Sequence, residues 1–221
     1  AKNIEGEMNH IIAETLAVSR LLSEIGLNGE NLSKAIYTAY VDLSEDPDVD
    51  IKVIYSAGAL KYSSRGAPVT AEDRALLEKG GKLENGRLTV LDHLTEDRKL
   101  ILLTPIRRSA LMGVLILEMN VNSINNRFLA PIKAGIRGHA WMMDSDGTLL
   151  YHPTQPGMVG KNLFKADRSC FQCHKSFDVE KKILESGDIG FSSYIAPYGE
   201  DKLIAFSRAR ASDMSWIVCV S

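Results

Sequence analysis

Two cysteines and a histidine stand close together in residues 169–174, which read Ser-Cys-Phe-Gln-Cys-His. Cys170 and Cys173, with His174 directly behind them, form a C-x-x-C-H motif, the spacing at which c-type haem is attached. Each thiol can form a thioether with one vinyl group of the porphyrin, and the histidine is then held beneath the iron as its proximal ligand. The motif therefore predicts covalently bound haem c at Cys170, Cys173 and His174.

Other interpretations of the two cysteines stay open. A C-x-x-C pair can be a redox dithiol, but that function is typical of a thioredoxin-like βαβ context, which this sequence does not show. It can be half of a zinc site, but Cys219 is the one further cysteine and no second ligand pair stands at close spacing. It can also be a plain disulfide or an accidental match. With the pair engaged, Cys219 is a lone thiol that we expect to be buried in the last strand.

The sixth ligand of the iron decides what such a haem does. If a side chain fills this position, the site transfers or senses electrons; if it is open or weakly filled, the iron can bind NO, CO or O₂. Candidates for the sixth ligand precede the motif, namely Met158, His139, Met143 and His152. Each of them also has a purely structural interpretation; Met143, for example, can be an apolar residue of a core strand, and His152 a structural residue.

The composition bounds the remaining function classes. A chain of 221 residues with 45% hydrophobic and 24% charged residues can form one large or two small globular domains. The formal net charge of −2 argues against a nucleic-acid partner, which needs a basic face. No apolar run approaches the ~20 residues of a transmembrane helix, and no signal peptide is visible, so we expect a processed or excised piece. No enzyme motif stands out, so no enzymatic activity is predicted.

Hydrophobic periodicity predicts the elements that position the motif. Apolar residues at three- and four-residue spacing predict helices over 3–25 and about 32–43. A cap at residues 70–73 predicts a short helix that ends at 80–81, and a further helix is expected over 179–186. Strands are expected over 51–56, 59–63, 86–92, 99–106, 111–120, 138–144, 148–152, 189–196, 203–210 and 216–220, with a partly helical connector over 120–134.

These elements predict an α+β fold, a long N-terminal helix followed by two units that each contain an antiparallel sheet with flanking short helices. We expect N-terminal helices over 1–44, a first unit over 45–130 and a second unit over 131–221 that carries the haem motif. The two units are similar in architecture only, because the amino-acid sequence contains no visible repeat.

Several segments of the second unit carry a resemblance to a known family. Residues 141–153 read Trp-Met-Met-Asp-Ser-Asp-Gly-Thr-Leu-Leu-Tyr-His-Pro, and residues 159–163 read Val-Gly-Lys-Asn-Leu. With residues 198–203 and the Trp-Ile-Val run at 216–218, they resemble the membrane-proximal half of double Cache (tandem PAS-like) sensor domains. The order of the elements is similar too, so the resemblance covers essentially the whole chain. It implies that residues 45–130 are the membrane-distal PAS-like unit.

The resemblance implies a sensor. Such domains are extracytoplasmic inputs of bacterial receptors, lie between two transmembrane helices, and feed a histidine kinase, a chemoreceptor or a cyclic-dinucleotide enzyme. The first helix often mediates dimer contacts, which makes a homodimer a candidate assembly. The haem motif looks like an insertion beside the proximal ligand pocket. The resulting prediction is a periplasmic domain of an inner-membrane receptor that senses redox state or a small gas through haem c.

Two alternative functions stay open. One is a haem-free double Cache domain that binds a small organic ligand, and the other is a monohaem electron-transfer cytochrome. A cytochrome devotes most of its chain to the haem, which disfavours that alternative here. The first unit lacks the Arg-x-Trp-Tyr signature of the amino-acid-binding family members, which weakens the prediction of amino-acid binding between residues 56 and 106.

Overall fold

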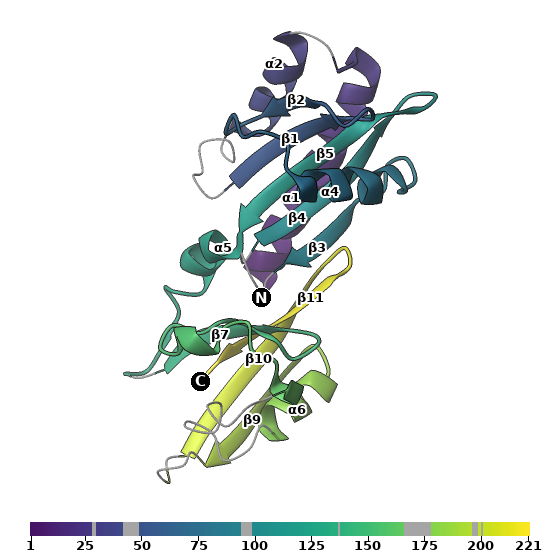
Figure 1. The fold of residues 1–221 in the computed structure, drawn as a ribbon. Coiled ribbons are helices and arrows are strands. Elements are labelled where there is room, and N and C mark those ends of the chain that lie inside the picture. The colour runs from purple at the N-terminus through teal and green to yellow at the C-terminus, as the bar shows by residue number, and fades with distance from the viewer. Residues whose placement is uncertain are drawn as a thin grey trace. The chain divides into compact units, whose positions relative to one another are not determined.

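The computed structural model describes residues 1–27, 30–41, 49–93, 99–136, 138–165, 178–195, 199 and 201–221 (Figure 1). These residues form two compact units. We call the described residues from 7 to 121 the distal unit, and residues 1–6 with the described residues from 122 onward the proximal unit. The expected mixed fold, with a long first helix and antiparallel sheets, is confirmed.

The chain begins with two helices, α1 (Lys2–Ile25) and α2 (Glu30–Ala39), whose residues from Glu7 onward belong to the distal unit. The apolar spacing that predicted the first helix reflects its packing, because its buried side chains include Met8, Ile11, Val18 and Leu22. The second helix ends at Ala39 rather than at the expected residue 43, and Tyr40 closes its last turn by donating its N–H to the Ile36 carbonyl at 2.9 Å.

Five antiparallel strands form the distal sheet in the order β2-β1-β5-β4-β3. Their bounds are β1 (Val49–Tyr55), β2 (Leu60–Ser63), β3 (Thr89–His93), β4 (Lys99–Arg107) and β5 (Leu111–Asn120). Helix α4 (Ala71–Gly81) lies on one face of this sheet and α1 lies on the other (Figure 1). The expected strand from residue 86 begins only at Thr89, because Gly86 turns the chain with a φ of +72°.

Helix α4 packs closely against the sheet. Its Leu76 joins a buried apolar cluster with residues of β1, β4 and β5, and each member is at most 4% exposed, namely Ile54, Ile101, Leu103, Val114 and Ile116. At the C-terminal end of the helix, a Cβ added to Gly80 would lie 2.6 Å from Val114 Cγ1. The absence of a side chain at Gly80 therefore lets the helix approach β5.

The proximal sheet has six strands in the order β6-β7-β11-β10-β9, with β8 paired to β7 off this path. The strands are β6 (Lys133–Ala134), β7 (Gly138–Asp144), β8 (Leu149–Tyr151), β9 (Ile189–Ile195), β10 (Asp201–Ala211) and β11 (Met214–Val220). The helical segments are α5 (Val121–Phe128), η1 (Pro156–Met158), η2 (Leu163–Lys165) and α6 (Asp178–Glu185). The two-residue strand β6 lies within the region expected to be a connector.

The hairpin between β7 and β8 is built as predicted. The Asp144 carboxylate accepts the N–H groups of Asp146 at 2.9 Å and Thr148 at 2.8 Å, so it is a turn residue. One face of the sheet packs with Ile183 of α6 into an apolar cluster that includes Trp141, Met143, Ile183 and Cys219. The predicted burial of Cys219 is confirmed, because this residue is 0% exposed. No described helix is long and apolar enough to cross a membrane.

Candidate functional site

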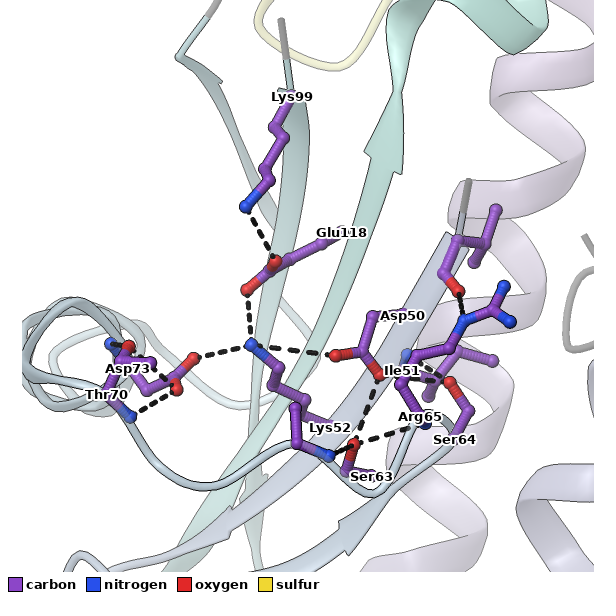
Figure 2. A network of polar contacts seen from close by, with 12 residues as sticks. Asp50, Ile51, Lys52, Ser63, Ser64, Arg65, Thr70, Asp73, Lys99 and Glu118 are labelled. Atoms are coloured by element: carbon purple, nitrogen blue, oxygen red, sulfur yellow. Dashed lines mark hydrogen bonds and ion pairs between the residues drawn. The ribbon is translucent and has the colours of Figure 1, made fainter. Parts of the chain in front are cut away.

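A buried cluster of charges lies where α4 begins above the distal sheet (Figure 2). We call it the charged cluster, and its members are Asp50 and Lys52 of β1, Asp73 of α4, Lys99 of β4 and Glu118 of β5. The Lys52 ammonium nitrogen lies 2.9 Å from Glu118 Oε1, 3.0 Å from Asp73 Oδ1 and 3.7 Å from Asp50 Oδ2. Lys99 Nζ lies 3.7 Å from Glu118 Oε2. One ammonium thus holds three carboxylates.

The strand register explains why this ammonium is needed. Asp50 of β1 stands directly opposite Glu118 of β5, and two like charges in that position destabilise a sheet. Lys52 follows Asp50 by two residues, so its side chain points to the same face. Burial makes the pairing more important, since Lys52 is 6% exposed, Asp73 1% and Glu118 9%. A buried carboxylate needs a partner, and Lys52 supplies one to both strands and to the helix.

Asp73 joins the charged cluster to the cap of α4. Its Oδ2 accepts the Thr70 N–H at 2.7 Å, and the Thr70 hydroxyl oxygen accepts the Asp73 N–H at 3.1 Å, which completes a capping box. Its other oxygen, Oδ1, accepts from Lys52. The predicted cap at residues 70–73 is therefore confirmed, and the same carboxylate attaches the start of the helix to the sheet.

The contacts within the charged cluster shift the pKa values of Lys52 and Asp73. Burial alone would lower the pKa of Lys52, but hydrogen bonds to Glu118 and Asp73 outweigh it, so the pKa is raised. Burial alone would raise the pKa of Asp73, but the Thr70 amide and the Lys52 ammonium lower it below its ordinary value. Lys52 and Asp73 are therefore both ionised at neutral pH. The sequence prediction missed the charged cluster, although a lysine within the apolar run Ile51–Ile54 is a visible signal.

In the proximal unit, the structure brings together two of the predicted sixth-ligand residues. The rings of His139 and His152 meet edge to face, with centroids 4.9 Å apart and planes at 68°. Trp141 stacks on His152 with a centroid separation of 6.4 Å. The backbone of His139 also pairs with Ser221, since each N–H donates to the other carbonyl, at 2.9 and 3.1 Å. The histidine pair therefore lies beside the C-terminal end of β11.

The two methionine candidates differ in their surroundings. Met143 is 1% exposed and packs inside the apolar cluster, whereas Met158 ends the short helix η1 and is half-buried. The motif residues Cys170, Cys173 and His174 lie outside the described residues. Within the described part of the chain, no group of three or more histidine, cysteine, aspartate or glutamate residues could hold a metal ion.

A buried carboxyl group lies on α6, the helix that follows the motif. Glu180 is 4% exposed, and burial raises its pKa from an ordinary 4.5 to about 7, with the nearby Asp178 charge adding to the rise. A carboxyl whose pKa is raised on folding stabilises the folded state fully below pH 4.5, and this contribution is lost as the pH rises through 7. The unfolding free energy of the native chain should fall across that window.

We expect Glu180→Gln to remove this pH dependence, because the amide stays neutral at every pH. Between pH 5 and pH 8, the unfolding free energy of the native chain should fall by roughly 2–3 kcal/mol more than that of the variant. Denaturant titration at the two pH values measures the difference. Glu185→Gln is the control, since Glu185 is exposed on the same helix and its replacement should change neither value. If both variants showed the same pH dependence of the unfolding free energy, Glu180 would not be its source.

A cavity of about 330 Å³ opens on the proximal unit beside the start of α1 and the end of α5. Its lining is mixed: Ile4, Phe128, Leu129 and Ile132 supply apolar side chains, and Lys2, Asn3 and Ser207 add polar groups. This volume lies at the lower end of the range that small ligands occupy in proteins. The cavity is thus a position to consider for a small organic ligand.

The whole chain matches the model of a known domain family. A family model described as Cache domain matches residues 1–221. The ligand-binding domain of the Pseudomonas aeruginosa PAO1 amino acid chemoreceptor PctC, in complex with GABA, is 17% identical with a TM-score of 0.67, covering 99% of this chain and 92% of that chain. The periplasmic sensory domain of the Campylobacter jejuni chemoreceptor Tlp1 is 19% identical with a TM-score of 0.63, covering 99% and 88%.

A third similar structure is the extracellular domain of a putative histidine kinase, at 17% identity and a TM-score of 0.63, covering 99% of this chain and 94% of that chain. At these identities the solved structures establish the fold. No curated protein sequence matches this chain. The predicted Cache architecture is confirmed by the family match, and the predicted extracytoplasmic location agrees with the periplasmic and extracellular domains of similar fold.

Proposed function

Because this chain belongs to the Cache domain family, we propose that it is the extracytoplasmic sensor domain of a transmembrane signalling receptor and that it binds a small molecule. The observation that carries the proposal is the family match over residues 1–221, which takes in both units. The output module is a histidine kinase, a chemoreceptor or a cyclic-dinucleotide enzyme. In this function the domain binds its signal and performs no chemistry on it.

The likeness in fold to sensory domains of chemoreceptors and of a histidine kinase supports this function. The domain of PctC was solved with GABA, a small zwitterion. A small organic ligand is therefore the first class to test here. The second class is a diatomic gas or a redox signal, which would need a bound iron.

A thermal-shift screen of the purified domain tests the proposal. A ligand at about 100 times its Kd should raise the Tm by roughly 5–10 °C. The screen should include amino acids, carboxylates without an amine, and NO or CO on protein that was matured with haem. The proposal predicts that one class raises the Tm while the others leave it unchanged. A flat response to all classes, with no cofactor in the matured protein, would contradict the sensor function.

We also propose that haem c is attached to Cys170 and Cys173 with His174 as the proximal iron ligand. The C-x-x-C-H spacing supports this second candidate function. When bound, haem would supply an iron that changes charge or binds a diatomic gas. Of the sixth-ligand candidates, Met143 is committed to the apolar core, so we favour His139, His152 or Met158.

A further inference from the structure

We infer that two copies of this chain dimerise through the outer face of strands β9 and β10 in the proximal unit. Four large apolar side chains, which we call the apolar strip, are exposed there. They are Ile189, Phe191 and Ile195 of β9 and Leu203 of β10, at 73%, 80%, 62% and 63% exposure. Strand β9 is the edge strand of the described proximal sheet, next to β10 (Figure 1). An apolar surface at the edge of a sheet is a frequent site of association.

The strand register places the whole apolar strip on one face of the sheet. Leu203 stands opposite Ser193, and directly opposite residues share a face. Ser193 lies two residues from both Phe191 and Ile195, and Ile189 lies two residues before Phe191, so all of them point the same way. The buried apolar cluster of the proximal unit lies on the opposite face. The strip is therefore one continuous patch.

Strand β9 directs its large apolar residues away from the core. The residues on its inward face are Gly190, Ser192 and Tyr194. A Cβ added to Gly190 would lie 2.6 Å from Phe206 Cζ, so a larger residue would have to displace this buried ring. A shift of one residue would bring a large side chain, Phe191 or Ile189, to that place, and it is disfavoured for this reason. The packing thus keeps the apolar residues outward.

The same outer face is covered over the neighbouring strands. Met142 of β7 and Val218 of β11 stand opposite each other on this face, and they are 0% and 5% exposed. Ser207 of β10 stands opposite Val218 on one side and Ile189 on the other. It lines the cavity together with Ile4 from the first turn of α1. The described cover of this face therefore ends where the apolar strip begins.

A second copy of this chain matches the apolar strip in both character and area. Strand β9 contains no charged residue, so a charged partner surface would gain no ion pair from it. The four side chains expose roughly 500 Å² together, a patch size that is often functional. Two identical strips packed face to face bury roughly 1,000 Å², and residues at the rim bring the contact near the ~1,200 Å² of the smaller specific interfaces.

The two strips pack about a two-fold axis that runs along the strands. Sheets that pack face to face lie ~10 Å apart with their strands nearly aligned. The β11 strands of both copies then point in the same direction, as two receptors in one membrane require. This orientation rests on the proposed sensor function. Antiparallel pairing of the two β9 edges would instead reverse one copy.

Sedimentation equilibrium of the purified chain tests the interface. The native chain should dimerise, and Phe191→Lys should raise the dissociation constant at least about 100-fold, because a two-fold interface contains the substitution twice. Ile136→Lys is the matched control, since Ile136 is a fully exposed apolar residue of the proximal unit outside the apolar strip. It should leave the dissociation constant unchanged. Both variants should keep the native circular dichroism spectrum, because both side chains are exposed.

A mixture of oppositely charged variants shows whether one strip meets the other. Phe191→Lys and Phe191→Glu should each be monomeric alone. Mixed in equal amounts at low ionic strength, they should dimerise, because opposite charges then attract each other across the two-fold axis. A mixture that associates no better than either variant alone would overturn the face-to-face contact.

Other results assign the apolar strip differently. A native chain that stays monomeric up to ~1 mM would overturn the dimer. Loss of the dimer in Leu21→Lys but not in Phe191→Lys would also overturn it, because Leu21 is a 40% exposed residue of α1. Flotation of the monomer with phosphatidylglycerol vesicles, abolished by Phe191→Lys, would assign the strip to a lipid surface instead. A monomer that still responds in the thermal-shift screen would keep the proposed sensor function.

Discussion

Replacing Lys52 by methionine should lower the unfolding free energy by about 3–5 kcal/mol, because breaking a buried ion pair leaves uncompensated charges in the interior. The methionine side chain is one atom shorter than that of lysine but keeps most of its bulk, so most of the loss reports the missing charge rather than a cavity. Asp50, Asp73 and Glu118 would remain together beneath α4 with only Lys99 nearby. Denaturant unfolding followed by circular dichroism at pH 7 measures the change.

Lys99→Met is the matched control, since Lys99 is 38% exposed and has a 3.7 Å contact to Glu118. This substitution should lower the unfolding free energy by less than about 1 kcal/mol, which is typical of exposed ion pairs. The cost of Lys52→Met should also shrink in acid. In the native chain the pKa of Asp73 is below its ordinary 3.8, so its contribution is present above that pH and is lost on further acidification. A loss from Lys52→Met no larger than that from Lys99→Met would show that the charged cluster contributes little.

The second large effect concerns Cys170 and Cys173. In cells that contain the machinery for cytochrome c maturation, the native chain should gain one covalently bound haem, seen as an increase in intact mass and a Soret band that survives denaturation. The double variant Cys170→Ser, Cys173→Ser should lose both signals completely, because neither hydroxyl forms a thioether. His174→Ala should keep the added mass but lose the native spectrum, since the proximal ligand is gone.

Cys219→Ser serves as the control for the haem experiment. Its thiol is buried in the proximal core and is 0% exposed, so its replacement should leave haem attachment unchanged. A correctly matured native chain without any tetrapyrrole on its cysteines would refute the haem proposal. The Cache assignment would then stand with a small organic ligand as its signal.

Much of the fold could be predicted because it depends on local patterns. The three- and four-residue spacing in α1 and the Thr70 cap of α4 are visible in the sequence and recur in the structure. The hairpin at Asp144 follows from turn residues between two apolar runs. Strand β6 and the C-terminal end of α2 were not predicted correctly. Two residues or a single helical turn are too short to show a periodic pattern.

The charged cluster could not be predicted in the same way. Lys52 and Glu118 are 66 positions apart, and their contact depends on the register of β1 against β5. Each residue alone reads as a polar interruption in an apolar strand. By contrast, the proximity of His139 and His152 was within reach, because a hairpin with a short turn brings the two strands of that region together. Elements that depend on local patterns were therefore predicted, whereas the charged cluster, which depends on the register between distant strands, was not.

The burial of Cys219 makes the reactivity of its thiol a measure of how often the proximal unit opens. Burial raises the pKa of its thiol, with the nearby Glu180 carboxyl adding to the rise, and the thiolate is the form that alkylating reagents attack. In the closed sheet the sulfur is therefore both inaccessible and protonated. Iodoacetamide reaches it only in molecules whose β7, β11 and β10 have separated. Its modification rate consequently measures the opening of the proximal unit by itself, whatever the distal unit does.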